Sequence, residues 1–180
     1  MHPPCTLSAG RLESEWKGEK MKIGVLSDSH DNLPKIRQAL KLFREAGAAC
    51  LVHAGDFVAP FAVRELLQFP GECYGCFGNN DGERAGIRKL WDHVYDPPHM
   101  IVVAGRRILL MHAPLKLPDL PAEMRSPDVL ISGHTHEMKL EAPAHGPLHL
   151  NPGEAGGWTT NHATAALLDS VSLEVRFIDL

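Results

Sequence analysis

The sequence predicts an α/β protein in which two mixed β-sheets pack face to face with helices outside. The first half of the chain alternates short apolar runs with amphipathic segments, the pattern of β-α-β-α-β. The second half consists mostly of apolar runs and hairpin patterns. Polar side chains follow five of the apolar runs, which favours a shared location at one sheet edge.

The first half supplies three strands and three helices. Residues 23–27 form a short apolar run, typical of a strand that is buried on both faces. A helix is predicted over 34–46, because Ile36, Leu40 and Phe43 repeat at helical spacing. The same reasoning predicts strands at 49–53 and 72–77 and helices at 60–69 and 83–91.

The second half is predicted to be built from hairpins and one further buried strand. Residues 100–103 and 107–111 flank Ala104-Gly105-Arg106 and indicate a hairpin. Residues 129–132 read as a buried strand, and residues 163–168 and 173–179 as a second hairpin. No internal repeat or linker interrupts this pattern, so we expect one domain over 21–180.

Composition and charge exclude several classes of protein. The chain has 180 residues, of which 44% are hydrophobic and 22% charged, which is ordinary for a globular domain. Its formal net charge of −4 argues against non-specific binding to nucleic acid. No apolar run approaches the ~20 residues that span a membrane. Residues 1–20 are expected to be a disordered leader or a stretch ahead of the true start, and we expect a cytoplasmic protein.

Seven candidate ligands follow the apolar runs and define the predicted site. Each motif alone is weak, since a single Asp-x-His pair is more often a turn or a surface pair. Together and in order they indicate one site. The seven residues are Asp28, His30, Asp56, Asn79, His112, His134 and His136.

The chemistry of these residues indicates two metal ions. Residues two apart in an extended stretch face the same way, so Asp28 and His30 can share one ion, and so can His134 and His136. Carboxylate, imidazole and amide ligands without thiolate favour Mn, Fe, Zn, Co or Ni over Ca. Seven ligands are too many for one ion and fit two if Asp56 bridges them.

A dinuclear centre predicts an anionic substrate and hydrolysis. Two divalent ions bring +4 and Asp28 with Asp56 return −2, so a phosphoryl group fits the resulting field. Two ions can lower the pKa of a bridging water, and the expected reaction is attack of the bridging hydroxide on phosphorus. The sequence contains neither a nucleophile elbow nor a P-loop.

The motifs resemble those of the calcineurin-like metallophosphoesterase superfamily, from Met21 over nearly the whole chain. Asn151-Pro152-Gly153 further resembles the small branch that includes the YfcE phosphodiesterase and Vps29. The resemblance implies a four-layer αββα sandwich and two divalent ions, with Mn favoured. One ion would be held by Asp28, His30, Asp56 and His136. The other would be held by Asp56, Asn79, His112 and His134.

The sequence departs from the family pattern at Asn80, where many relatives carry a histidine that acts as a general acid. Asn80 can hydrogen bond but cannot donate a proton as an acid. This favours diesters with good leaving groups over monoesters. We name Asp56, Asn80 and Asp81 as catalytic candidates, and His53 and His149 as candidates that support the ligands.

The predicted function is a metal-dependent phosphodiesterase acting on a small phosphate ester. One alternative is a catalytically weak interaction scaffold of the Vps29 type. Another is a nucleotide or dinucleoside polyphosphate hydrolase with the same centre. Binding to a membrane or to nucleic acid is not expected, and a homo-oligomer is left open.

Overall fold

Two mixed β-sheets form the framework of the protein in the computed structural model, which describes residues 20–180. The six-stranded sheet has the order β11-β10-β1-β2-β3-β4, and the five-stranded sheet has the order β5-β6-β7-β9-β8. The strands are β1 (Lys22–Leu26), β2 (Ala48–His53), β3 (Glu72–Cys76), β4 (Val94–Tyr95), β5 (His99–Val103), β6 (Arg106–Leu110), β7 (Val129–Ile131), β8 (Met138–Glu141), β9 (Leu148–Pro152), β10 (Thr164–Asp169) and β11 (Val175–Asp179).

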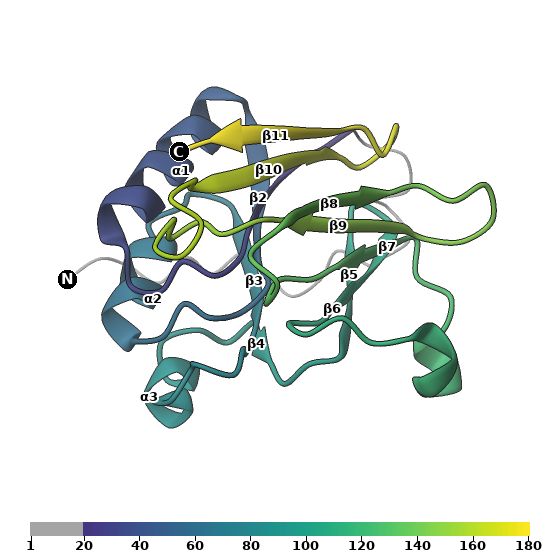
Figure 1. Ribbon diagram of the computed structural model, residues 1–180, viewed down its shortest axis with the longest axis horizontal. Helices are drawn as coiled ribbons and strands as arrows, with labels where there is room; N and C mark the ends of the chain where they lie inside the picture. Colours follow the sequence, from purple (N-terminus) through teal and green to yellow (C-terminus); the bar gives the residue numbers. More distant parts are fainter. Residues whose placement is uncertain (1–19) are drawn as a thin grey trace, which may run out of the picture.

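The layers follow from which side chains each strand buries on its two faces. In β1, Leu26 packs toward the helices, whereas Ile23 and Val25 pack between the two sheets. The helices α1 (Leu33–Glu45), α2 (Pro60–Leu66) and α3 (Arg84–Arg88) lie beside the six-stranded sheet, away from the other sheet (Figure 1). The expected pair of mixed sheets with outer helices is therefore confirmed.

Helix α1 forms where the sequence predicts it, one residue earlier than expected. The side chain of Asn32 accepts a hydrogen bond from the backbone N–H of Lys35 at 3.4 Å and so caps the first turn. Phe43 is fully buried and lies directly against Gly24 of β1, where a Cβ would overlap its ring. The helix ends before Gly47, whose φ of +74° is a conformation that glycine adopts without strain.

The outer face of the five-stranded sheet is covered differently from the expected helix layer. Two short 3₁₀ turns, η2 (Leu117–Asp119) and η3 (Ala122–Met124), take the place of an α-helix. Leu120 between them is buried against Leu109 and Leu130.

Two features of the chain bear on the expected boundaries. The expected leader over 1–20 lies outside the described residues, apart from Lys20. Within residues 20–180, no helix is both long enough and apolar enough to cross a membrane.

The sheet topology brings the predicted ligands to one edge. Strands β1, β2 and β3 are parallel neighbours, so their carboxyl ends reach the same edge of the six-stranded sheet. Strands β6 and β7 are also parallel neighbours in the second sheet. The loops after these five strands carry all seven candidate ligands.

Candidate metal centre

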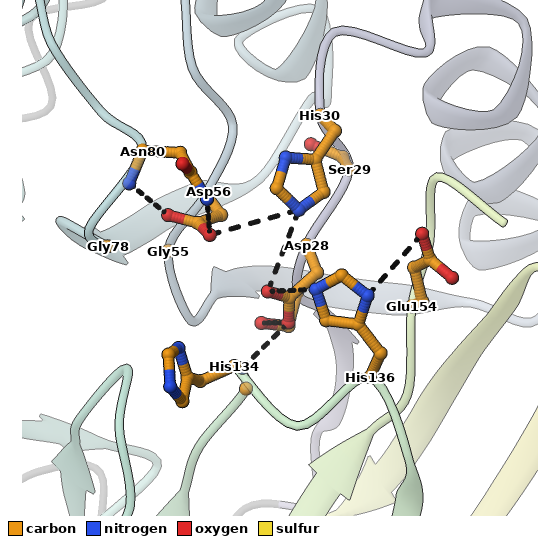
Figure 2. Close-up of polar contacts among 12 residues, drawn as sticks. Asp28, Ser29, His30, Gly55, Asp56, Gly78, Asn80, His134, His136 and Glu154 are labelled. Carbon is orange, nitrogen blue, oxygen red and sulfur yellow. Dashed lines mark hydrogen bonds and ion pairs between the residues drawn. The ribbon is translucent and has the colours of Figure 1, made fainter. Parts of the chain in front are cut away.

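The loops after β1, β2, β3, β6 and β7 bring their polar side chains into a single cluster. Figure 2 shows the carboxylates of Asp28 and Asp56 facing the rings of His30 and His136. Two groups of three residues have ligand atoms close enough to hold an ion. These groups are Asp28, His30 and His136, and Asp28, Asp56 and His112.

The first group centres on one oxygen of Asp28. The Nε2 atoms of His30 and His136 lie 3.9 Å and 3.3 Å from Asp28 Oδ1. Two ligand atoms that share one transition-metal ion at ~2.1 Å are themselves roughly 3–3.5 Å apart. The separations therefore match a ligand shell, slightly expanded at His30.

The second group lies around Asp56 and joins the first. Asp56 Oδ2 lies 3.4 Å from His112 Nε2 and 3.8 Å from His30 Nε2, so it faces both groups. Asn79 Oδ1 lies 2.9 Å from His112 Nε2 and 2.9 Å from His134 Nδ1. The structure thus brings together all seven residues that the sequence singled out.

The backbone at the ligands adopts a conformation that most residues avoid. Five of the candidate ligands have positive φ: Asp28 (52°), His30 (41°), Asp56 (59°), His134 (70°) and His136 (61°). Aspartate and histidine tolerate this left-handed region better than most non-glycine residues. Strained backbone of this kind clusters at functional sites.

Close backbone approach also requires glycine beside the ligands. A Cβ at Gly133 would overlap Ser27 Oγ and the carboxylate of Asp28. With no side chain there, the N–H of the next residue, His134, reaches Asp28 Oδ2 at 3.0 Å. The glycine before His134 therefore lets the β7 loop contact the β1 loop.

The two carboxylates differ in their electrostatic surroundings. Burial raises the pKa of Asp28, which is fully buried. Burial acts in the same direction on Asp56, but His112 and the hydrogen bonds from Asn80 outweigh it and hold the pKa of Asp56 well below its usual range. Asp28 is the carboxylate whose negative charge is least compensated by the protein, and a cation would compensate it.

Two further observations show that the residues fit a divalent metal ion. Within residues 20–180, the buried side-chain atoms that make no hydrogen bond are Asp28 Oδ1 and His30 Nε2, which face each other. Buried polar atoms without a hydrogen-bond partner are rare, and a bound ion is one of the partners that accounts for them. His112 Nδ1 lies 2.8 Å from the carbonyl oxygen of Ala54 and must donate to it. A donor at Nε2 as well, which is what stabilises the Asp56 carboxylate in the metal-free site, requires a protonated ring. In a neutral ring the Nε2 lone pair faces Asp56 Oδ2 and Asn79 Oδ1, and a cation could then bind all three atoms.

The catalytic candidates Asn80 and Asp81 occupy different positions. The Asn80 backbone N–H donates to Asp56 Oδ1 at 2.8 Å, and its exposed side chain donates to Asp56 Oδ2 at 2.6 Å. Asp81 is buried, and its carboxylate accepts hydrogen bonds from the backbone N–H groups of Asp56, Val58 and Gly78. Asn80 thus lies at the ligand cluster, whereas Asp81 ties the β2 and β3 loops together from behind.

His53 and His149, the two residues predicted to support the ligands, differ in their position and contacts. His53 Nδ1 accepts the N–H of Gly55 at 3.2 Å, and His53 Nε2 lies 3.0 Å from Ser29 Oγ, so this ring links two ligand loops. Burial lowers the pKa of His53 to about 3 and keeps the ring neutral. His149 is farther from the cluster of candidate ligands. Its Nε2 lies 2.8 Å from Oγ of Ser132, the residue before Gly133.

Sequence reasoning missed three residues that hold the β7 loop. The Asn151 amide donates to the carbonyl of Gly133 and to Thr135 Oγ1. Glu154 and Thr159 lie against His136. Asn151 begins the quoted Asn151-Pro152-Gly153 motif and Glu154 follows it directly, so this motif could have marked both residues as site candidates. Thr159 lies in a turn with no sequence signal.

The fold and the site together define an α/β protein that presents carboxylate, imidazole and amide ligands for divalent metal at a sheet edge. The profile of the calcineurin-like phosphoesterase superfamily domain matches residues 21–172, and the chain belongs to this superfamily.

Two curated relatives are similar over most of their length. The chain is 32% identical over 167 residues to phosphodiesterase MJ0936 of Methanocaldococcus jannaschii, covering 89% of this chain and 99% of that protein. It is 30% identical over 174 residues to phosphodiesterase YfcE of Escherichia coli K12, covering 86% and 91%.

Solved structures show the same fold. An archaeal phosphodiesterase superimposes with a TM-score of 0.79 at 32% identity, covering 89% of this chain and all of the other. A variant of Vps29 from Entamoeba histolytica has a TM-score of 0.62 at 19% identity, covering 89% and 99%. The second likeness concerns the fold alone.

Proposed function

We propose that this protein is a metal-dependent phosphodiesterase. The observation that carries the proposal is the complete set of seven ligands, converging around two buried atoms that make no hydrogen bond within residues 20–180. Membership of the phosphoesterase superfamily and the similarity to two phosphodiesterases support it. The proposed site holds two ions, with Mn²⁺ favoured and Fe, Zn, Ni or Co as alternatives.

In this proposal, Asp56, Asn80 and Asp81 have different roles. Two bound divalent ions would supply Lewis acidity and a water of lowered pKa. Asp56 Oδ2 faces His30 and His112 and is the proposed shared ligand. The Asn80 amide, exposed at the edge of the cluster, can turn from Asp56 to hold a phosphate oxygen. Asp81 acts by fixing the loops of Asp56 and Asn79 rather than by touching substrate.

The absence of an acid at Asn80 leads to the proposed substrate preference. A general acid contributes typically ~10²–10⁴-fold in rate when the leaving group is poor. Diesters with good leaving groups do not need this contribution, so we propose them over monoesters. Nucleotide substrates, a homo-oligomer and a cytoplasmic location remain predictions from the sequence.

The test uses full-length protein stripped with a chelator and then supplied with Mn²⁺, Zn²⁺ or Ni²⁺. We expect Mn²⁺-dependent hydrolysis of bis-p-nitrophenyl phosphate and weaker hydrolysis of the monoester. The panel includes nucleotides and dinucleoside polyphosphates. Asp56→Asn should lower the rate by ~10²-fold or more, because it removes a charged ligand. Metal-induced stabilisation without hydrolysis of any ester would overturn the proposal and favour an interaction scaffold.

A matched variant tests the role of Asn80. Asn80→His restores a group that can donate a proton at the same position. We expect a gain on the monoester relative to the diester, with the folded protein and its metal content unchanged. An equal effect on both substrates would contradict the proposed basis for the preference.

A further inference from the structure

Glu154 is a fully buried carboxylate directly behind the ligand His136 (Figure 2). It follows β9 and lies on the side of the ring away from Asp28. Its two oxygens accept hydrogen bonds from the backbone N–H groups of Trp158, Thr159 and Thr160 and from the hydroxyls of Thr159 and Thr160. A buried carboxylate with this many donors is fixed in place and acts as an acceptor only.

The direction of each hydrogen bond at His136 follows from that constraint. Because Glu154 only accepts, the Thr159 hydroxyl donates its proton to Glu154 Oε2 at 2.9 Å. The lone pairs of Thr159 Oγ1 are then available for His136 Nδ1, which lies 2.7 Å away and must donate. His136 Nδ1 also lies 3.5 Å from Glu154 Oε1. The proton of a neutral His136 ring is therefore on Nδ1.

This leaves the lone pair of His136 on Nε2, the atom that faces the metal centre. Nε2 lies 3.3 Å from Asp28 Oδ1, which makes no hydrogen bond within residues 20–180. An N–H at Nε2 could have satisfied that oxygen, but the relay places the proton on the other side. The arrangement thus leaves the Nε2 lone pair of His136 available to bind a cation, while Asp28 Oδ1 receives no hydrogen bond from this ring.

We propose that Glu154 and Thr159 are positioning residues for metal binding, forming a carboxylate–hydroxyl–imidazole relay that fixes the tautomer and orientation of His136. The inference rests on His136 being a ligand of the proposed site. Partners of this kind, which hydrogen bond to a metal-binding histidine, typically contribute ~10–100-fold to metal affinity.

Thr160 offers a matched control for a purely structural role of Glu154. Its single hydroxyl proton is directed to the same oxygen, Glu154 Oε2, at 2.7 Å, with the carbonyl of His162 as a second, more distant acceptor at 3.0 Å. The structure gives it no contact with His136. Thr160→Val removes a hydroxyl from the same buried carboxylate, whereas Thr159→Val also removes the acceptor for His136 Nδ1.

The experiment measures Mn²⁺ binding to chelator-stripped protein by titration calorimetry, and unfolding of the metal-free variants by urea. We expect Thr159→Val to weaken at least one Mn²⁺ binding step by ~10–100-fold. Thr160→Val should change affinity less than about threefold even if it loses as much stability. Thr159→Ser keeps the hydroxyl and should restore wild-type affinity. In the metal-free state, ¹⁵N NMR should show His136 protonated on Nδ1 in the wild type and a mixture of tautomers in Thr159→Val.

The outcomes separate this inference from the proposed function. If the wild type binds Mn²⁺ and the two valine variants bind it equally well, the relay is wrong and the metal site stands. Failure of Thr159→Ser to restore binding would also overturn the relay. If the wild type binds no divalent ion, both the relay and the proposed function are wrong.

Discussion

His53 predicts a specific loss of stability in acid. The ring is fully buried, its two nitrogens are hydrogen bonded to Gly55 and Ser29, and it makes a T-shaped contact with the ring of Phe57. Burial lowers its pKa from 6.5 to about 3. The unfolded chain therefore binds a proton at this residue between these two values, while the folded protein does not. By linkage, this difference makes stability fall as the pH drops below 6.5 and leaves stability near neutral pH unaffected.

The magnitude follows from the two pKa values. At about pH 5, the unfolded state is favoured by RT ln[(1 + 10^1.5)/(1 + 10^−2)], or about 2 kcal/mol. At about pH 7.5 the same expression is close to zero. A protein that lacks an ionisable group at this position should not show this part of the acid loss.

The assay compares wild type with His53→Gln, whose amide can still donate to Ser29. Urea unfolding is followed by circular dichroism in chelator-containing buffer at the two pH values. We expect the difference in unfolding free energy between wild type and variant to shift by about 2 kcal/mol in favour of the variant at the lower pH. Identical pH dependence for both proteins would refute the reasoning, because all other titrating groups are common to them.

Three further outcomes are expected. Asp81→Asn leaves some of its three backbone N–H donors, two of them buried, without an acceptor. It should therefore lower the unfolding free energy by about 1–3 kcal/mol and weaken Mn²⁺ binding, and an unchanged urea midpoint and affinity would contradict this. Gly75→Ala should cost about 1–3 kcal/mol, because its Cβ would overlap the buried ring of Trp91. Gly82→Ala, with nothing within 4 Å of its Cβ, should be close to neutral, and equal effects of the two alanines would refute the steric argument. Adding Mn²⁺ to stripped protein should raise the melting temperature by mass action, and no shift at saturating metal would exclude a tight site.

The ligand set could be predicted because each member directly follows a buried strand. In parallel strands, the residues at the carboxyl ends must meet at one edge, so chain order alone brings Asp28, Asp56 and Asn79 together. The joint occurrence of the motifs then distinguished these candidate ligands from other polar residues. The sequence therefore predicted which side chains converge, and metal binding by these side chains stays a prediction.

The missed parts lack such local signals. Strand β8 does alternate apolar and polar residues, but over only four positions that are all exposed, so its signal is short and was overlooked. Strand β4 has only two residues and shows no periodicity. The turn that holds Thr159 beside His136 depends on where Glu154 is buried, which is a property of the packed fold. The short 3₁₀ turns on either side of the buried Leu120 also have no periodic pattern of their own in the sequence.

The pairing of β1 has a consequence for synthesis of the protein on the ribosome. One neighbour of β1 is β2, which follows soon after it, but the other is β10, which comes near the end of the chain. Until β10 has emerged, the nascent chain exposes an unpaired edge of a strand that carries Asp28 at its tip. Docking of the final hairpin is thus the step that closes the sheet, and slow translation before it would prolong exposure to aggregation.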